Sequence, residues 1–406
     1  MKCGLLGRKL GHSYSPRIHS YLGSYPYVLF EKEPEEVGDF IRNGDFTGIN
    51  VTMPYKKDVI PYLDELSPAA VKMGAVNTIV RRADGTLFGH NTDYFGFLTL
   101  VKNSGISVSG KKALVLGSGG ASGTAVKALE ELGAQVIVIS RSGENNYENL
   151  HLNKDAAVIV NATPVGMYPN TGAAPLDLKQ FPHLEGVLDA IYNPARTQLL
   201  LDAEKLGIPN EGGLWMLVAQ AVEASEHFTG RKYESSVIHA IYRKLSAQMK
   251  NIVLVGMPGC GKTTIGAALA EKLGRKLVDA DDEIIRLAGK SIPEIFAQDG
   301  EAAFRALETQ ALSELGKQSG LILATGGGCV TQERNYSLLH QNGNLFWLKR
   351  DIDRLPTNGR PLSQSNALAD MYAAREPMYR AFADFTVDNN GSVEATAQAI
   401  LSQLEG

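Results

Sequence analysis

Cysteine is scarce in this sequence, and the chain carries no excess of positive charge. Its three cysteines are Cys3, Cys260 and Cys329, which form neither a C-x-x-C pair nor an even-numbered disulfide framework. This usage is typical of a protein in the reducing cytosol. The formal net charge of −4 lacks the basic balance that attracts nucleic acids or anionic membranes. Small anionic substrates would therefore have to be held by local groups.

Long apolar runs and targeting signals are missing as well. No run of roughly 18 or more apolar residues occurs, and the chain enters a strand-like stretch at 2–6 without a signal or transit pattern. Tandem repeats and low-complexity tracts are also absent. We therefore expect a soluble cytoplasmic protein without a membrane or nucleic-acid partner, and its oligomeric state stays open.

The length and composition predict more than one globular domain. Hydrophobic residues make up 44% of the sequence and charged residues 21%, which is typical of a chain that buries a core. Because 406 residues exceed one ordinary domain, we expect about two or three.

Residues 256–263 spell G-x-x-x-x-G-K-T, the pattern of a phosphate-binding loop. Its glycines let backbone N–H groups converge on phosphate oxygens, while Lys262 adds a positive charge and Thr263 offers a hydroxyl to Mg²⁺. The pattern requires a strand before the loop and a helix after it, and we expect these at 251–255 and 265–273. A glycine-rich turn without a ligand is the competing interpretation. The residues expected to contact ATP are Gly259, Cys260, Gly261, Lys262, Thr263 and Thr264.

A second glycine-rich turn lies at 117–122. The sequence around it predicts strands at 111–116 and 135–139 with a helix at 123–132 between them, as at the start of a dinucleotide-binding domain. The turn departs from G-x-G-x-x-G because Ser122 stands where the third glycine would be.

The residues after the second of these strands indicate which cofactor such a domain would take. An Asp or Glu there would select NAD, but this chain has Arg141 between two serines. Because an arginine can accept a 2′-phosphate, NADP is favoured. The alternative is that Arg141 is an ordinary surface residue.

Polar residues in the first segment have ordinary as well as catalytic interpretations. In an extended backbone, Ser13 and Ser15 would place both hydroxyls on one side, where they could donate to one carboxylate. Pro16 after them also fits a plain helix start, which is the better interpretation of these residues alone. Taken singly, Lys56 and Asp93 fit a solvated lysine and a helix cap.

A hairpin is predicted to lead into the run that ends at Asp93. The dipeptide Asp84-Gly85 lies between strand-like stretches at 77–82 and 86–89, and this composition favours a tight turn.

Four motifs in this segment occur in an order that resembles shikimate dehydrogenase. They are H-S-x-S-P, N-V-T-x-P-x-K, A-V-N-T and N-T-D, and with N-A-T-P-V-G-M and D-A-I-Y-N-P further on the resemblance covers essentially all of 1–245. It implies that Lys56 and Asp93 are the catalytic pair, which suits a ketone reduction because the developing alkoxide needs a proton. It further implies substrate contacts by Ser13, Ser15, Thr52, Asn77, Tyr192 and Gln220.

The same resemblance supports NADPH as the cofactor. The pyrophosphate would lie at the glycine-rich turn, where a helix begins. The expected cofactor contacts are Gly117, Gly119, Gly120, Ala121, Arg141, Thr163 and Gly213.

The last part of the chain carries a further set of motifs. A strand-like stretch at 276–281 ends in Asp279 and Asp281, whose side chains would alternate in direction, so that one faces the metal and the other the acceptor. G-E-A-A-F-R, G-G-G, G-R-P-L and R-E-P-M-Y follow, whereas the H-R-D and D-F-G patterns of protein kinases are absent. Over 249–406 these motifs resemble shikimate kinase.

This second resemblance implies a phosphoryl transfer from ATP with Mg²⁺. It assigns catalysis to Lys262, Asp281 and Arg360, the last on a lid that neutralises charge on the transferring group. It places Thr263 at the metal and Asp279 near it through water. For each arginine alone, a surface ion pair is the ordinary alternative. The residues implied to bind the acceptor are Asp281, Arg305, Gly327, Gly328 and Arg375.

Together the two resemblances predict an α/β protein. We expect a three-layer α/β substrate domain at 1–103 plus 214–248, and an NADP-binding Rossmann domain at 104–213. A P-loop domain with a parallel sheet, similar to nucleoside monophosphate kinases, should occupy 249–406. Almost no linker separates the helical stretch that ends near 248 from this last domain.

The expected function is a bifunctional enzyme. It would reduce 3-dehydroshikimate to shikimate with NADPH and then phosphorylate shikimate to shikimate 3-phosphate with ATP. Two alternatives remain at this point. The first domains could act on quinate with NAD, or one half could be a catalytically silent regulatory module.

Overall fold

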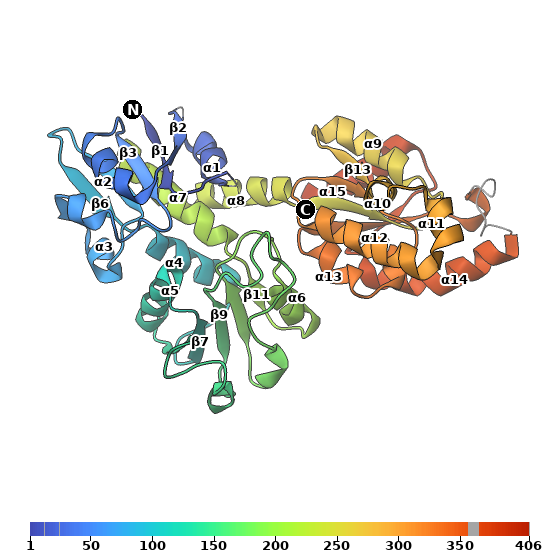
Figure 1. Ribbon diagram of the computed structural model, residues 1–406, viewed down its shortest axis with the longest axis horizontal. Helices are drawn as coiled ribbons and strands as arrows, with labels where there is room; N and C mark the ends of the chain where they lie inside the picture. The colour runs from blue at the N-terminus through green and yellow to red at the C-terminus, as the bar shows by residue number, and fades with distance from the viewer. Residues whose placement is uncertain (12, 24, 356–364, 406) are drawn as a thin grey trace. The chain divides into compact units, whose positions relative to one another are not determined.

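The computed structural model describes residues 1–405 apart from 12, 24 and 356–364, and it contains three β-sheets (Figure 1). Each of the three segments expected to form a domain contributes one sheet. The boundaries between these domains stay a prediction. Backbone contacts divide the chain into two compact units, one comprising Met1–Met167, Ala173–Tyr192 and Asp202–Leu245, the other Tyr168–Gly172, Asn193–Leu201 and Ser246–Gly406.

The first sheet is mixed, with the strand order β2-β1-β3-β5-β6-β4. Strands β2, β1 and β3 run parallel, whereas β5 is antiparallel to both β3 and β6. Parallel neighbours need a crossover connection, and helices provide it. The elements of this part are β1 (Cys3–Gly7), α1 (Ser15–Leu22), β2 (Tyr27–Glu31), α2 (Pro34–Asn43), β3 (Gly48–Val51), β4 (Glu65–Leu66), α3 (Pro68–Met73), β5 (Thr78–Arg81), β6 (Leu87–His90) and α4 (Asp93–Ser104).

Strands β5 and β6 form the predicted hairpin. The N–H of Arg82 donates to the carbonyl of Thr86 at 2.8 Å, which closes the turn. Gly85 in that turn has a φ of 88°, a value that glycine adopts without strain. The Asp-Gly signal in the sequence is therefore confirmed.

The second sheet is entirely parallel, with the order β11-β10-β9-β7-β8. Its central strands are largely apolar and buried along nearly their whole length, as expected for a parallel sheet covered on both faces. The elements are β7 (Lys112–Leu116), α5 (Gly120–Glu131), β8 (Gln135–Ile139), β9 (Val158–Asn161), β10 (Gly186–Asp189), α6 (Gln198–Lys205) and β11 (Asn210–Glu211). Two further helices follow, α7 (Leu214–Thr229) and α8 (Ser235–Met249).

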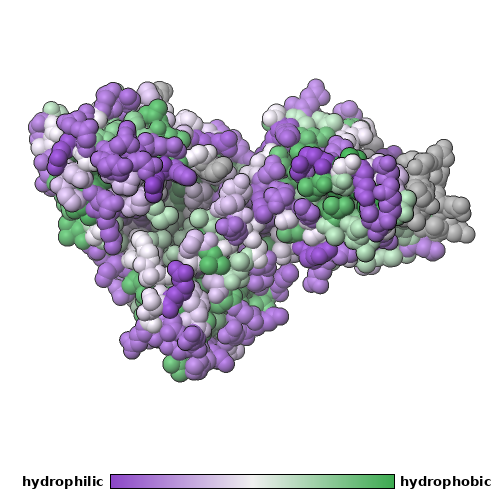
Figure 2. Space-filling model, viewed as in Figure 1, coloured by the Kyte–Doolittle hydropathy of each residue, from purple (hydrophilic) through white to green (hydrophobic). Residues whose placement is uncertain are grey.

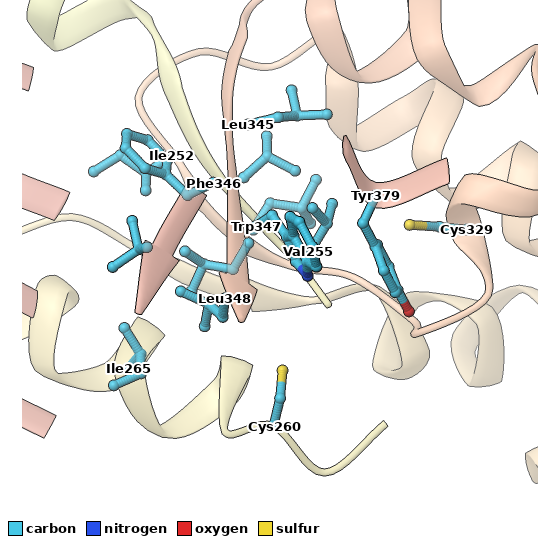
Figure 3. Packing of buried hydrophobic residues seen from close by; sticks show 14 of the residues in the cluster. Ile252, Val255, Cys260, Ile265, Cys329, Leu345, Phe346, Trp347, Leu348 and Tyr379 are labelled. Atoms are coloured by element: carbon cyan, nitrogen blue, oxygen red, sulfur yellow. The ribbon is translucent and has the colours of Figure 1, made fainter. Parts of the chain in front are cut away.

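The third sheet is also parallel, with the order β13-β14-β12-β15-β16, and helices lie on both of its sides (Figure 1). Its core includes Trp347 stacked on Tyr379 at a centroid distance of 5.9 Å, with Cys329 on the other side of the tyrosine (Figure 3). The elements are β12 (Asn251–Val255), α9 (Lys262–Leu273), β13 (Leu277–Asp279), α10 (Ala280–Ala288), α11 (Ile292–Gln298), α12 (Gly300–Gly316), β14 (Ile322–Ala324), α13 (Asn335–His340), β15 (Gly343–Lys349), α14 (Ser365–Phe382), β16 (Phe385–Asp388) and α15 (Val393–Glu405).

Helix boundaries differ from the expected ones at glycine-rich turns. Helix α5 begins at Gly120 and α9 at Lys262, each three residues before the predicted start. In both cases residues of the loop motif themselves enter the helix, so apolar periodicity marks the start too late. Lys250 alone separates α8 from β12, which confirms that the chain has almost no linker there.

Polar residues cover much of the face seen in Figure 2, and apolar residues appear between them in smaller groups. Within the described part of the chain, no helix combines the length and the apolar character needed to cross a membrane.

Candidate active sites

The first candidate site lies where the parallel strands β1 and β3 end. In open α/β sheets, ligands bind at the edge where parallel strands have their carboxyl ends. Thr52 follows β3 directly, and its N–H donates to the carbonyl of Leu6 in β1 at 2.9 Å. Its methyl group would lie 2.7 Å from a Cβ placed on Gly7, so the two strand ends are in close contact. This packing holds Thr52 at the sheet edge.

Lys56 and Asp93 meet in this site. Nζ of Lys56 donates to Oδ2 of Asp93 at 2.6 Å, and the two side chains are 26% and 14% exposed. Lys56 comes from the loop after β3, whereas Asp93 is the first residue of α4. A hydrogen-bonded lysine and carboxylate that solvent can reach are able to pass a proton to a substrate. The structure thus brings the predicted pair together.

Asn77 fixes the turn that carries Asp93. Its Oδ1 accepts a hydrogen bond from the N–H of Thr92 at 2.7 Å, and its Nδ2 donates to the Thr92 hydroxyl at 3.0 Å. Both side chains are buried. Asn77 therefore ties the hairpin to the start of α4, in addition to the substrate contact predicted for it.

Ser13 and Ser15 have a different geometry from the extended one that the sequence suggested. Tyr14 between them has φ −83° and ψ −7°, a helical conformation, so the two hydroxyls do not lie along one side of a strand. Instead, Oγ of Ser13 accepts from the N–H of Ser15 at 3.2 Å, and Pro16 lies in the first turn of α1. The extended interpretation is wrong because a serine hydroxyl here satisfies a free N–H at the helix start.

Tyr192 and Gln220 come from later segments of the same compact unit. The ring of Tyr192 meets that of Tyr14 edge-on, with centroids 6.0 Å apart, so Tyr192 contacts the residue that lies between the two serines in sequence. Burial raises the pKa of Tyr192, which keeps its hydroxyl protonated. Gln220 lies where α7 packs on α4, because a Cβ placed on Gly96 of α4 would be 3.2 Å from the Cβ of Gln220. Gly96 is one turn after Asp93, so Gln220 lies near the start of α4.

The second glycine-rich turn joins β7 to α5. Gly117 has a φ of 105°, and Gly119 is the N-cap residue of the helix. A Cβ on Gly119 or Gly120 would meet no atom within 4 Å, so the space over the turn is open to a phosphate group. Ser122, which replaces the third glycine, donates its hydroxyl to the carbonyl of Gly117 at 2.6 Å. The serine therefore closes the turn instead of weakening it.

Other predicted cofactor residues follow neighbouring strands of this sheet or lie in α5. Arg141 is exposed after β8, and Ala121 is half-buried in the first turn of α5. Thr163 comes after β9, where its N–H and hydroxyl donate to Oδ1 of Asn161 at 3.0 and 2.7 Å. Strands β7, β8 and β9 are parallel, so these residues lie at one edge of the sheet.

Gly213 has a packing task of its own. A Cβ on this residue would lie 2.1 Å from the carbonyl oxygen of Ala190, a distance that no side chain can occupy. Its N–H donates to the carbonyl of Ile191 at 2.9 Å. The glycine is therefore required for the fold, whatever contact it makes with a cofactor.

In the other compact unit, the phosphate-binding loop leads from β12 into α9. Nζ of Lys262 donates to the carbonyls of Gly256 and Met257 at 2.9 and 3.1 Å, and the lysine is buried. Gly259 and Gly261 have φ values of 80° and 99°, which only glycine adopts readily. The ammonium group is thus held inside the loop whose N–H groups would bind phosphate.

Thr263 and Asp279, the two residues predicted at or near the metal, meet in the structure. The hydroxyl of Thr263 donates to Oδ2 of Asp279 at 2.8 Å. Thr263 is thereby held beside Asp279, as expected if Thr263 binds Mg²⁺ and Asp279 lies near it through water. Thr264, next in the first turn of α9, is exposed.

Asp279 and Asp281 do not alternate along a strand. Strand β13 ends at Asp279, whose Oδ1 accepts from the N–H of Asp281 at 3.0 Å and so caps α10. The expected strand through 281 is wrong because an Asp followed by several acidic residues favours a helix start. Asp281 nevertheless reaches the glycine triplet, since a Cβ on Gly326 would be 3.3 Å from its Oδ1.

Each glycine of the triplet after β14 faces a different group. A Cβ on Gly326 would lie 2.7 Å from Oε1 of Glu308, and one on Gly327 would lie 2.6 Å from Pro258 of the phosphate-binding loop. A Cβ on Gly328 would lie 2.3 Å from a guanidinium nitrogen of Arg305. Any side chain here would displace one of these groups, so the triplet is what lets them converge.

Two arginines lie beside this triplet. Arg305 donates to the carboxylate of Glu308 at 2.9 Å and to that of Glu301 at 3.2 Å. Arg375 on α14 donates to the carbonyl of Gly327 at 3.2 Å, and Tyr379, one turn later, donates to the same oxygen at 2.5 Å. The predicted acceptor residues are therefore gathered in one place. Arg360, predicted on the lid, lies outside the described residues.

Comparison with known proteins decides the family. Residues 5–79 match the family model of the shikimate dehydrogenase substrate binding domain. The NADP(+) shikimate dehydrogenase of Clostridium perfringens strain SM101 is 35% identical over 267 residues, covering 60% of this chain and 98% of that enzyme. This chain belongs to the shikimate dehydrogenase family. Residues 258–405 match the shikimate kinase family model, so the dehydrogenase is fused to a kinase domain.

Solved structures agree with the dehydrogenase assignment. Shikimate dehydrogenase 1 from Peptoclostridium difficile matches with a TM-score of 0.56 and 38% identity, covering 60% of this chain and 98% of that one. The Thermus thermophilus enzyme, determined in complex with NADP(H) and shikimate, matches with a TM-score of 0.54 and 32% identity, covering 60% and 99%. The expected fold class is confirmed.

Two residues of the kinase domain had no role in the sequence-based prediction. Glu308 is fully buried beside Arg305, and Tyr379 is fully buried against Gly327. Glu308 lies three residues after Arg305 on a helix, so the spacing alone could have indicated a contact. Tyr379 ends the R-E-P-M-Y motif. The sequence carried no signal for its hydrogen-bond partner, the carbonyl of Gly327, because that residue lies in the loop after β14, far away in the chain.

We expect Lys56→Ala to lower the kcat of the dehydrogenase by about 10²–10⁴-fold, because the proton-transfer pair loses its ammonium group. The dehydrogenase rate is measured by NADPH consumption with 3-dehydroshikimate. The kinase rate, measured separately on the same preparation by ADP release with added shikimate, should be unchanged. Lys57→Ala is the matched control, since this neighbouring lysine is exposed. Equal dehydrogenase rates in the two variants would contradict the assignment.

A pair of glycine variants should separate folding from cofactor binding. Gly213→Ala is expected to destabilise the dehydrogenase by about 1–3 kcal/mol, because its Cβ overlaps the Ala190 backbone. Gly119→Ala should leave the thermal midpoint unchanged but raise the KM for NADPH, because its methyl group enters the open space over the turn. Thermal unfolding and steady-state kinetics provide the two readouts. An unchanged KM in a stable Gly119→Ala protein would remove this turn from the cofactor site.

Glu308→Gln is expected to raise the KM of the kinase for shikimate by about tenfold or more, since it removes the buried charge that orients Arg305. Glu301→Gln is the control, because this carboxylate contacts the same arginine but is 68% exposed. Both variants are compared by KM and kcat at saturating ATP. Similar KM values in both would show that Glu308 does not position the arginine.

Proposed function

We propose that this chain catalyses two successive reactions at separate sites. The dehydrogenase part reduces 3-dehydroshikimate to shikimate with NADPH, and the kinase domain phosphorylates shikimate to shikimate 3-phosphate with ATP. The observation that carries the proposal is the 2.6 Å contact between Lys56 and Asp93 at the carboxyl edge of the first sheet. Family membership alone does not show this contact, because the contact depends on how this sequence folds.

The Lys56–Asp93 pair supports ketone reduction. NADPH, when bound, supplies a hydride to the carbonyl carbon. The carbonyl oxygen then gains negative charge and needs a proton within hydrogen-bond distance. The two side chains are 2.6 Å apart and partly shielded from water, and Asn77 holds Thr92, the residue before Asp93. The pair can therefore stabilise that charge and deliver the proton.

Hydroxyl groups support binding of the substrate in the dehydrogenase. Ser13, Ser15 and Thr52 follow the ends of adjacent parallel strands or begin the next helix, and the hydroxyl of Tyr192 is kept protonated by burial. Such groups can donate to a carboxylate or to ring hydroxyls without adding charge. These hydroxyls would add to the charged Lys56–Asp93 pair, which is proposed to act on the carbonyl group.

The cofactor residues fit NADPH. Open space lies over Gly119 and Gly120 at the N-terminus of α5, where a pyrophosphate would be stabilised by N–H groups and by the helix dipole. Arg141 is exposed after β8, at the position that contacts the 2′-position of the ribose in this type of domain. A phosphate there would pair with the guanidinium group.

The kinase domain would use charge where the dehydrogenase uses hydroxyls. Arg305 and Arg375 offer planar guanidinium groups to the shikimate carboxylate. Asp281 would accept the proton of the attacking hydroxyl. It lies beside Gly326, and the next glycine, Gly327, packs against Pro258 of the phosphate-binding loop. Thr263 would bind Mg²⁺, with Asp279 near the metal through water. Lys262 would contact the phosphates, and Arg360 is proposed to act on the transferring group.

A coupled assay tests this function. The full chain is given 3-dehydroshikimate, NADPH, ATP and Mg²⁺, and NADPH loss and ADP release are followed together. We expect both signals, with ADP release delayed until shikimate has formed. Lys262→Ala should retain NADPH loss and abolish ADP release, with shikimate accumulating. NADPH loss without any ADP release by the wild type would mean that the kinase half is catalytically silent.

The same assay distinguishes the quinate alternative. Rates with NADPH and 3-dehydroshikimate are compared with rates of quinate oxidation by NAD. A higher specificity constant for quinate and NAD would overturn the assignment of the first activity while leaving the second intact.

A further inference from the structure

Three ionisable side chains outside both active sites gather between β6 and α7. His90 is the last residue of β6, and Glu223 and His227 lie four residues apart on α7, hence on one face of that helix. One ligand atom from each residue lies within 4.8 Å of the others. The rings of His90 and His227 are close, with centroids 4.1 Å apart and a tilt of 40°. We call these three residues the His90 cluster.

Each member of the His90 cluster has a buried polar atom without a partner. Nδ1 of His90, Oε2 of Glu223 and Nε2 of His227 are all inaccessible to solvent and make no hydrogen bond within the described part of the chain. One such atom costs free energy, and native proteins contain few of them. Three unsatisfied atoms in one cluster therefore indicate a missing partner, and a cation that accepts an electron pair from each residue would be such a partner.

The cluster offers three possible ligand atoms to one cation. A neutral imidazole has one ring nitrogen with a free lone pair, and a carboxylate oxygen can also donate an electron pair to a metal. The nearby Lys232 is paired with Glu226 at 2.6 Å.

We propose that His90, Glu223 and His227 bind one divalent transition-metal cation, of which zinc fits best. Two imidazoles and one carboxylate form a ligand set that zinc accepts with a fourth position left for water. Mg²⁺ and Ca²⁺ prefer sites made of oxygen alone, so the two histidines select against them. Each of the three residues is partly exposed as a whole, although its unpaired atom is buried.

The position of the site assigns it a bracing role in the dehydrogenase. The carbonyl of His90 accepts a hydrogen bond from the N–H of Asn77 at 3.1 Å, and Asp93 follows three residues later. Helix α7 carries Gln220 one turn before Glu223. A bound cation would therefore join the strand that leads to Asp93 to the helix that carries Gln220. It takes no part in either reaction, and the inference does not depend on the proposed function.

Cobalt and zinc titrations of the full chain test the proposal. After treatment with a chelator and its removal, the protein is titrated with Co²⁺ alone and, separately, with Zn²⁺ alone, without ATP. We expect one Co²⁺ per chain, with the visible absorption of a four-coordinate ion and without the charge-transfer band of thiolate ligands. Zn²⁺ should displace it and raise the thermal midpoint of the dehydrogenase part.

Matched variants identify the ligands. Glu223→Gln and His227→Gln should each weaken Co²⁺ binding by at least ~10-fold and abolish the zinc-dependent rise of the midpoint. His151→Gln, which removes an exposed histidine elsewhere, should behave like the wild type. Metal-free NADPH consumption and circular dichroism of each variant show that it is folded, and if one variant fails to fold, the other decides.

Two results would overturn the inference. One is the absence of stoichiometric Co²⁺ and Zn²⁺ binding to the wild-type chain. The other is binding that persists unchanged in both folded ligand variants, which would place the metal elsewhere.

Discussion

The parallel arrangement of strands determines where the two candidate active sites lie. Parallel neighbours require crossover helices, so their carboxyl ends and the loops that follow them collect at one edge of each sheet. Thr52 and Lys56 follow β3, the glycine-rich turn follows β7, and the phosphate-binding loop follows β12. The antiparallel hairpin of β5 and β6 is the exception in the first sheet, and it serves to bring Asp93 to Lys56.

Features made of consecutive residues were the ones that the sequence could predict. The loop at 256–263 and the hairpin around Asp84 were recognisable because their residues are consecutive. Asp281 was misplaced although the signal was present, since Asp279 followed by acidic residues is a helix cap. The extended Ser13–Ser15 pair failed for the same reason, because a helix start competes with a strand for the same serines.

Contacts between segments that are distant in sequence could not be predicted in this way. The glycine triplet suggested close approach, but only the fold shows that its members face Glu308, Pro258 and Arg305. Gly213 was assigned to a cofactor, whereas the backbone of Ala190 already excludes a side chain there. The His90 cluster joins a strand end to a helix much later in the chain, and none of its residues belongs to a motif. Side-chain convergence of this kind is a product of packing.

The two candidate sites offer different groups to a carboxylate. In the dehydrogenase part, the predicted substrate residues include the hydroxyls of Ser13, Ser15 and Thr52, which can donate hydrogen bonds without carrying a charge. The kinase domain places Arg305 against a buried carboxylate, and burial raises the pKa of Glu308 while the arginine opposes that rise. A guanidinium group held by Glu308 is already oriented before a ligand arrives, so less conformational entropy is lost on binding. Phosphoryl transfer needs the acceptor fixed in line with ATP, and an arginine that is oriented in advance meets that demand.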